Sequence, residues 1–148
     1  MPIRLCLGSD PTPYATLMWL LLALFLARVL GQVLAATARP RWLPPMARWY
    51  SGLMPYRYLL PAQLLIVWLM AAMTRAAASG AGALGEPRER TGVWVLWVSY
   101  VYAAGMVARA VRYARQPPDR RGVLIPIVFH FALAGFLFVY GSWHLHPG

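Results

Sequence analysis

The chain has 148 residues, of which 60% are hydrophobic and only 12% are charged, and its formal net charge is +10. Soluble domains carry about twice that charged fraction, and disordered chains have low hydrophobicity, so the composition excludes both classes. A basic balance of this size can indicate nucleic-acid binding, but here every basic residue is Arg and most lie between apolar segments, where they contact lipid headgroups and direct topology. We therefore expect an integral membrane protein with the lipid bilayer, and not nucleic acid, as its partner.

Four apolar segments have lengths that suit membrane-spanning helices, since a hydrocarbon layer about 30 Å thick requires roughly 20 helical residues. They cover residues 14–38, 53–73, 93–111 and 123–143. Their apolar runs are continuous, whereas the strands of a membrane barrel alternate over about ten residues. The sequence predicts an all-α fold, an integral membrane four-helix bundle that forms one domain over residues 1–148.

The first segment follows Arg4 and ends near Ala36-Thr37-Ala38, a pattern that also suits a signal peptide and its cleavage site. Arg28 and Gln32 interrupt the approach to that site, so we expect residues 14–38 to be retained as a span. Its small residues recur every four positions and predict a close helix-packing face, made of Ala23, Ala27, Gly31 and Ala35.

The connections between the spans differ in composition. Residues 39–57 combine Pro with Trp and Tyr, a mixture typical of a segment that lies at the lipid headgroups. Residues 76–85 contain only Ala, Ser, Gly and Leu, and mixed charges follow them. We expect an interfacial loop over 39–57 and a flexible loop over 76–92.

The distribution of Arg residues predicts the orientation, because cytoplasmic loops carry the excess of positive charge. The loops after the first and third segments hold nine: Arg39, Arg41, Arg48, Arg57, Arg109, Arg112, Arg115, Arg120 and Arg121. The N-terminal tail and the central loop hold four: Arg4, Arg75, Arg88 and Arg90. We expect both termini on the non-cytoplasmic side. The Ala- and Arg-rich composition without Lys indicates a GC-rich bacterial genome, and with it the bacterial inner (plasma) membrane.

Few polar side chains lie inside the spans, and each costs free energy there. Arg28 lies roughly 15 Å inside the first segment, and Gln32 follows one turn later on the same face. In the predicted orientation the candidates from all four spans lie in the cytoplasmic half: Arg28, Gln32, Gln63, Tyr102, Arg109 and His130. If they converge, they form a basic, hydrogen-bonding pocket that suits an anionic lipid headgroup, a phosphate or the polar head of a quinone.

Simpler explanations stay open for single members of this set. Arg28 can extend along the helix to reach the headgroups. Gln63 can make an interhelical hydrogen bond worth about 0.6 kcal/mol, and His130 can be a buried imidazole with a satisfied hydrogen bond.

Several function classes lack their usual residues. No Asp or Glu lies in any span, so the carboxylate relays of many transporters are missing. Three His residues and the single Cys6 are too scattered for a zinc site, and no phosphate-binding loop, nucleophile elbow or dinucleotide motif occurs. We expect no metal site and leave catalytic residues and cofactors unassigned.

A haem role has one supporting observation, the spacing of His130 and His144 on the last span. Bis-His haem binding needs a second helix with axial His residues, which only a homodimer of this chain would supply. The ending Trp143-His144-Leu145-His146 is more simply an interfacial anchor.

Four spans with short connections leave little chain outside the membrane for a catalytic domain. We therefore expect a non-catalytic subunit of a membrane assembly or a homo-oligomer. The first alternative is a membrane-embedded enzyme or binding protein for an anionic lipid or isoprenoid head at the predicted pocket, and the second is a haem or quinone redox protein.

Overall fold

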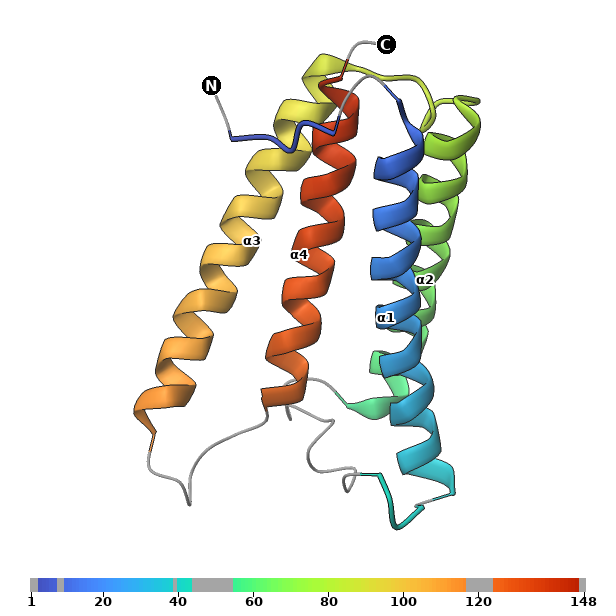
Figure 1. Cartoon of the computed structure of the whole chain (residues 1–148). Helices are drawn as coiled ribbons and strands as arrows, with labels where there is room; N and C mark the ends of the chain where they lie inside the picture. The colour runs from blue at the N-terminus through green and yellow to red at the C-terminus, as the bar shows by residue number, and fades with distance from the viewer. Residues whose placement is uncertain (1–2, 8–9, 39, 44–54, 117–123, 147–148) are drawn as a thin grey trace.

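The computed structural model describes residues 3–7, 10–38, 40–43, 55–116 and 124–146. In these ranges the chain forms helices and no strands: α1 (Thr12–Thr37), α2 (Tyr56–Ser79), α3 (Glu89–Arg115) and α4 (Leu124–His144) (Figure 1). All four helices are long and apolar enough to cross a membrane. This confirms the all-α fold class and supports an integral membrane protein.

Two of the helices extend beyond the predicted apolar segments. Helix α2 continues past 73 because Ala, the best helix former, occupies three of the next positions, and it ends at Gly80 in a left-handed conformation with φ of 63°. Helix α3 begins at Glu89, whose negative charge suits the first turn of a helix. The predicted loop over 76–92 was therefore too long, since the connection covers only residues 80–88. The centre of the predicted interfacial loop, residues 44–54, lies outside the described residues.

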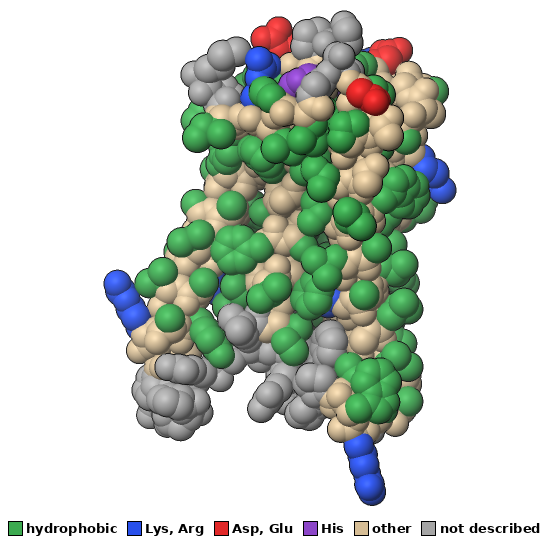
Figure 2. Space-filling model, viewed as in Figure 1, with side chains coloured by type: hydrophobic (Ala, Val, Ile, Leu, Met, Phe, Trp, Pro, Cys, Tyr) green, Lys and Arg blue, Asp and Glu red, His purple; other side chains and the backbone are tan. Residues whose placement is uncertain are grey.

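The helices form a row in the order α3, α4, α1, α2 (Figure 1). Helix α4 packs against both α3 and α1, and α1 packs against α2, while α2 meets α4 over a smaller contact. In the most apolar stretch of each helix, 50% of the residues of α4 and 39% of those of α1 are buried, against 17% for α2 and for α3. Hydrocarbon rather than water suits the apolar surfaces that the two outer helices expose (Figure 2).

Large side chains fill the contact between α1 and α4. Tyr14, Met18, Leu22 and Phe25 recur at three- and four-residue spacing on the inner face of α1, and they share one buried cluster with Phe136 of α4. The predicted small-residue face of α1 is confirmed only in part as an internal contact. Ala35 is buried and Gly31 is half-buried, but Ala23 and Ala27 are exposed. Large side chains on α1 make more van der Waals contacts with α4 than Ala does, and they therefore occupy the face of α1 that turns inward.

Small residues make the closest approach elsewhere, between α3 and α4. A Cβ atom placed on Gly92 would lie 2.9 Å from the carbonyl oxygen of Gly141 and 2.8 Å from Cγ of Leu145. Only glycine fits this crossing without displacing backbone.

The two ends of the molecule differ in charge. The start of α1, the end of α4 and the connection 80–88 lie together at what we call the upper end, which is uppermost in Figure 1. The described carboxylates, Asp10, Glu86 and Glu89, lie at this end (Figure 2). At the opposite, lower end α3 terminates in Arg112 and Arg115.

Candidate functional site

The six predicted polar residues come from all four helices, and we call them the buried polar cluster: Arg28 and Gln32 on α1, Gln63 on α2, Tyr102 and Arg109 on α3, and His130 on α4. Arg28, Gln32 and Gln63 are buried, whereas Tyr102, Arg109 and His130 are half-buried. Two hydrogen bonds join neighbouring helices within this set. Gln63 Nε2 donates to Gln32 Oε1 over 2.9 Å, and the Tyr102 hydroxyl lies 2.6 Å from His130 Nδ1. The interhelical hydrogen bond predicted for Gln63 therefore forms, as does a hydrogen bond to the imidazole of His130.

Arg28 points into the protein. Its side chain is only 6% exposed, and its guanidinium carbon lies 6.0 Å from the ring centre of Phe25 and 5.7 Å from that of Phe129. The faces of these rings attract a cation. The structure thus contradicts the alternative in which Arg28 reaches out to the headgroups, because two aromatic rings hold the guanidinium between α1 and α4.

Positive charge converges on the Tyr102–His130 pair from two helices. The charges of Arg28 and Arg109 both act on Tyr102 and on His130. The described carboxylates all lie at the upper end, where Arg88 and Glu86 form the one ion pair found among the described residues, at 3.0 Å. The buried polar cluster is therefore basic, and the described part of the chain supplies no anion to it.

Three buried polar atoms of the cluster have no hydrogen-bond partner: Arg28 Nε, Gln32 Nε2 and Gln63 Oε1. Gln32 and Gln63 are 1% and 3% exposed, so solvent does not reach these atoms from outside the protein. Buried polar atoms in native proteins nearly always have partners, and leaving one unpaired costs about 1–3 kcal/mol. Two of the three atoms are hydrogen-bond donors and one is an acceptor. The donors suit a ligand with oxygen acceptors, and the acceptor suits a hydroxyl group on the same ligand.

The two His residues considered for haem binding have their Nδ1 atoms engaged within the chain. His130 Nδ1 lies against the Tyr102 hydroxyl, and His144 Nδ1 accepts a hydrogen bond from the backbone N–H of Arg88 over 3.1 Å. Within the described ranges, no three His, Cys, Asp or Glu side chains are grouped closely enough to hold a metal ion.

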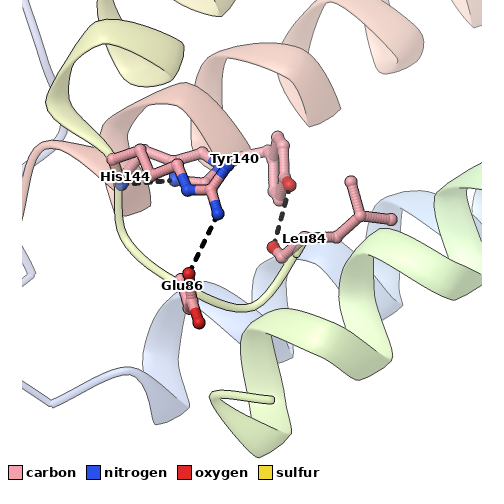
Figure 3. A network of polar contacts seen from close by, with 5 residues as sticks. Leu84, Glu86, Tyr140 and His144 are labelled. Carbon is pink, nitrogen blue, oxygen red and sulfur yellow. Dashed lines mark hydrogen bonds and ion pairs between the residues drawn. The ribbon is translucent and has the colours of Figure 1, made fainter. Parts of the chain in front are cut away.

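A second polar network, which the sequence did not predict, lies at the upper end (Figure 3). The hydroxyl of Tyr140 donates to the carbonyl oxygen of Leu84 over 3.0 Å, and the Arg88 N–H donates to His144. The connection 80–88 is thereby tied to the end of α4. Trp143 and His144 are 4% and 3% exposed, which corrects the prediction that they form an interfacial anchor.

The N-terminal segment joins the same end of the molecule. The Tyr14 hydroxyl donates to the carbonyl oxygen of Leu5 and lies 3.0 Å from His146 Nδ1, while the Leu5 N–H donates to Ser142 Oγ over 3.0 Å. No local spacing reveals the pairs of Tyr14 with His146 and of Leu5 with Ser142, because their members lie at opposite ends of the chain. The even number of predicted spans was the available signal, since it places both termini on one side.

The positions and unpaired atoms of the buried polar cluster are thus the main geometric evidence on function. Comparison of the chain with protein-family models, with curated proteins and with solved structures finds no match.

Proposed function

We propose that this chain is a protein of the bacterial inner membrane that binds an anionic, phosphate-type group in the buried polar cluster, reached from the cytoplasmic side. The observation that carries the proposal is Arg28, a buried cation with an unpaired Nε and no carboxylate partner among the described residues. An anion would supply both the missing charge and the missing acceptor.

The energetic balance at Arg28 favours a ligand. Placing Arg at the centre of a span costs about 2.5–3.5 kcal/mol on insertion scales. Its contacts with Phe25 and Phe129 each return about 0.5–2 kcal/mol, but an aromatic ring gives Nε no in-line acceptor. A phosphate oxygen forms a charge-assisted hydrogen bond with a guanidinium and so offsets the remaining cost.

The other unpaired atoms specify the ligand further. Gln32 Nε2 can donate to a second oxygen of the anion, and Gln63 Oε1 can accept from a protonated phosphate oxygen or a neighbouring hydroxyl. The pair of Tyr102 and His130, with Arg109 nearby, lies on the opposite side of Arg28 in the row of helices. The cluster therefore suits a phosphate that carries a hydroxyl or a hydroxylated substituent.

A lipid is the favoured source of this phosphate. Tyr102 also borders an exposed apolar surface of α3, together with Trp97, Val101 and Gly105. A Cβ atom placed on Gly105 would meet nothing within 4 Å, so this surface is open at that point. An acyl or isoprenoid chain that lies along this surface would be attached to a headgroup near Tyr102.

The experiment compares binding of inorganic phosphate and of short-chain phosphatidic acid to the purified protein by calorimetry in a maltoside detergent. Arg28→Gln removes the charge, Arg28→Lys retains it, and Arg112→Gln removes an exposed Arg from the lower end as a matched control. We expect Arg28→Gln to weaken binding by about 30-fold or more, the equivalent of about 2 kcal/mol, and the control to leave it unchanged.

Comparing the two ligands shows whether the bound phosphate group comes from a lipid headgroup or from free phosphate. Tighter binding of phosphatidic acid than of inorganic phosphate supports a lipid headgroup, and equal binding supports free phosphate. Failure of both ligands to bind, or equal losses in Arg28→Gln and Arg112→Gln, would overturn the proposal.

A second candidate function is a subunit of a membrane assembly or a homo-oligomer. The exposed positions Ala23 and Ala27 favour it, because small residues on a lipid-facing surface permit close helix approach by another chain. Native mass spectrometry of the gently solubilised protein tests this function. A monomer without bound protein would contradict it and leave the anion site unaffected.

A further inference from the structure

The buried polar cluster holds more positive charge than one Arg residue supplies. Arg109 lies two helical turns after Tyr102 on α3, and so on the same face of that helix. The charges of Arg28 and Arg109 both act on Tyr102 and on its hydrogen-bond partner His130. The described carboxylates lie at the upper end, so the described part of the cluster has two formal positive charges and no negative one.

The guanidinium group of Arg28 is available to a ligand. The side chain is buried, and among the described residues no hydrogen bond engages any of its three nitrogens. A guanidinium presents its N–H groups as a planar fork, which matches two oxygens of the same phosphate group. Arg28 can therefore hold one face of a phosphate without losing a contact within the chain.

The pair of Tyr102 and His130 offers one more donor, whichever way its own hydrogen bond runs. If the Tyr102 hydroxyl donates to Nδ1, a neutral imidazole carries its proton on Nε2 and can donate from there. If Nδ1 donates to the hydroxyl oxygen, the hydroxyl hydrogen is free instead. The unpaired Gln32 Nε2 lies on the side of Arg28 that faces α2, so donors are present on both sides of Arg28.

This arrangement distinguishes two classes of phosphate ligand. A phosphate monoester has three terminal oxygens and carries about two negative charges above neutral pH, whereas a diester has two terminal oxygens and a single charge. Three oxygens that point in different directions can reach donors on both sides of Arg28. Two negative charges also balance the two Arg residues.

We propose that the buried polar cluster selects phosphate monoesters over phosphodiesters, with Arg28 holding the phosphate and Arg109 recognising its second negative charge. This inference rests on the proposed function, because it requires that a phosphate group binds in the cluster. It adds the chemical class of the headgroup and gives Arg109 a role in specificity.

The test is calorimetric titration of the purified full chain at about pH 8 with dioctanoyl phosphatidic acid, a monoester, and dioctanoyl phosphatidylglycerol, a diester with the same acyl chains. The glycerol hydroxyls of phosphatidylglycerol give Gln63 Oε1 a donor that phosphatidic acid lacks. A preference for phosphatidic acid therefore reports the charge and the oxygens of the phosphate.

Three variants assign the preference to Arg109. Arg109→Gln removes its charge and Arg109→Lys retains it. Arg112→Gln is the matched control, since it removes an exposed Arg three residues later on the same helix.

We expect the wild-type chain to bind phosphatidic acid at least about tenfold more tightly than phosphatidylglycerol. In Arg109→Gln this ratio should fall to about threefold or less, because phosphatidic acid loses affinity while phosphatidylglycerol keeps most of its own. Retained binding of phosphatidylglycerol also shows that the variant is folded. Arg109→Lys and Arg112→Gln should both keep the wild-type ratio.

Two kinds of failure are distinguishable. Equal binding of the two lipids by the wild-type chain, or an unchanged ratio in Arg109→Gln, would overturn this inference and leave the phosphate site in place. Absence of binding by both lipids would overturn the proposed function and this inference with it.

Discussion

At the scale of single residues, burying the positive charge of Arg28 costs free energy, and its contacts with two aromatic rings offset only part of that cost. Two phenyl rings and the nearby Tyr102 are its described surroundings, and none of them carries a negative charge at neutral pH. A residue of this kind is expected to lower the stability of the empty protein and to raise its affinity for an anion. Stability and binding should therefore respond in opposite directions to its replacement.

Arg28→Met tests this opposition. Replacing a buried charge by an apolar side chain of similar length is often neutral or stabilising by about 1–4 kcal/mol, so we expect a higher free energy of unfolding in delipidated protein. The measurement is denaturant unfolding in detergent, with Arg112→Met at the exposed lower end as the control, expected to change stability by less than about 0.5 kcal/mol. Destabilisation by Arg28→Met would mean that Arg28 has a charged partner within the chain.

The Gln32–Gln63 pair makes a second prediction, about the contact between α1 and α2. Gln63→Leu removes the donor to Gln32 Oε1 and leaves both polar ends of a buried amide unpaired, at a cost of about 1–3 kcal/mol. Gln32→Leu should cost a similar amount. In a double-mutant cycle the two losses should not add, with a coupling of about 0.6 kcal/mol, and strict additivity would argue against the hydrogen bond.

At the scale of helices, the α3–α4 contact depends on two glycines that allow the helices to approach. Gly92 faces the backbone of Gly141, and a Cβ atom on Gly141 would lie 3.0 Å from the backbone nitrogen of Leu96. Because α4 also packs on α1, a shift at this crossing would move one of the two inner helices.

Gly92→Ala should therefore destabilise the protein by about 1–3 kcal/mol, the usual cost of forcing an extra methyl group into a packed contact. Gly105→Ala on the same helix is the matched control. Its added Cβ would meet nothing within 4 Å, so we expect stability to stay the same or to rise by up to about 1 kcal/mol through helix propensity. The measurement is the Tm of both variants in thermal unfolding. Similar Tm shifts in the two variants would contradict the close approach of Gly92 to Gly141.

At the scale of the whole molecule, the structure places the start of α1 and the end of α4 at one end, but a membrane orientation needs the charges as well. The upper end carries the described acids, which offset the Arg residues there, whereas the described residues of the lower end include Arg41, Arg57, Arg112 and Arg115 and no acid. The positive excess favours the lower end in the cytoplasm.

We therefore expect reporter fusions at either terminus to be periplasmic: alkaline phosphatase active and green fluorescent protein dark. A fusion in the connection between α1 and α2 should show the reverse. Cytoplasmic activity of a terminal fusion would reverse the orientation and place the buried polar cluster nearer the outer face.

The sequence by itself determined that the chain forms four long apolar helices, their approximate positions and which polar side chains lie within them. These features are local: hydrocarbon demands long apolar runs, and any polar side chain within such a run stands out. The helix ends were less predictable, as α2 and α3 show, because Ala and charged residues extend a helix beyond its apolar segment.

Tertiary structure alone decided which faces meet. The choice of Met18 over Ala23 as an inward residue, the inward turn of Arg28 and the pairing of Tyr14 with His146 depend on contacts between residues that are distant in the sequence. A helix in lipid is apolar on all sides, so hydrophobic periodicity does not distinguish its buried face from its lipid-facing one. Packing and hydrogen bonding between helices make that choice, and they exist only in the assembled fold.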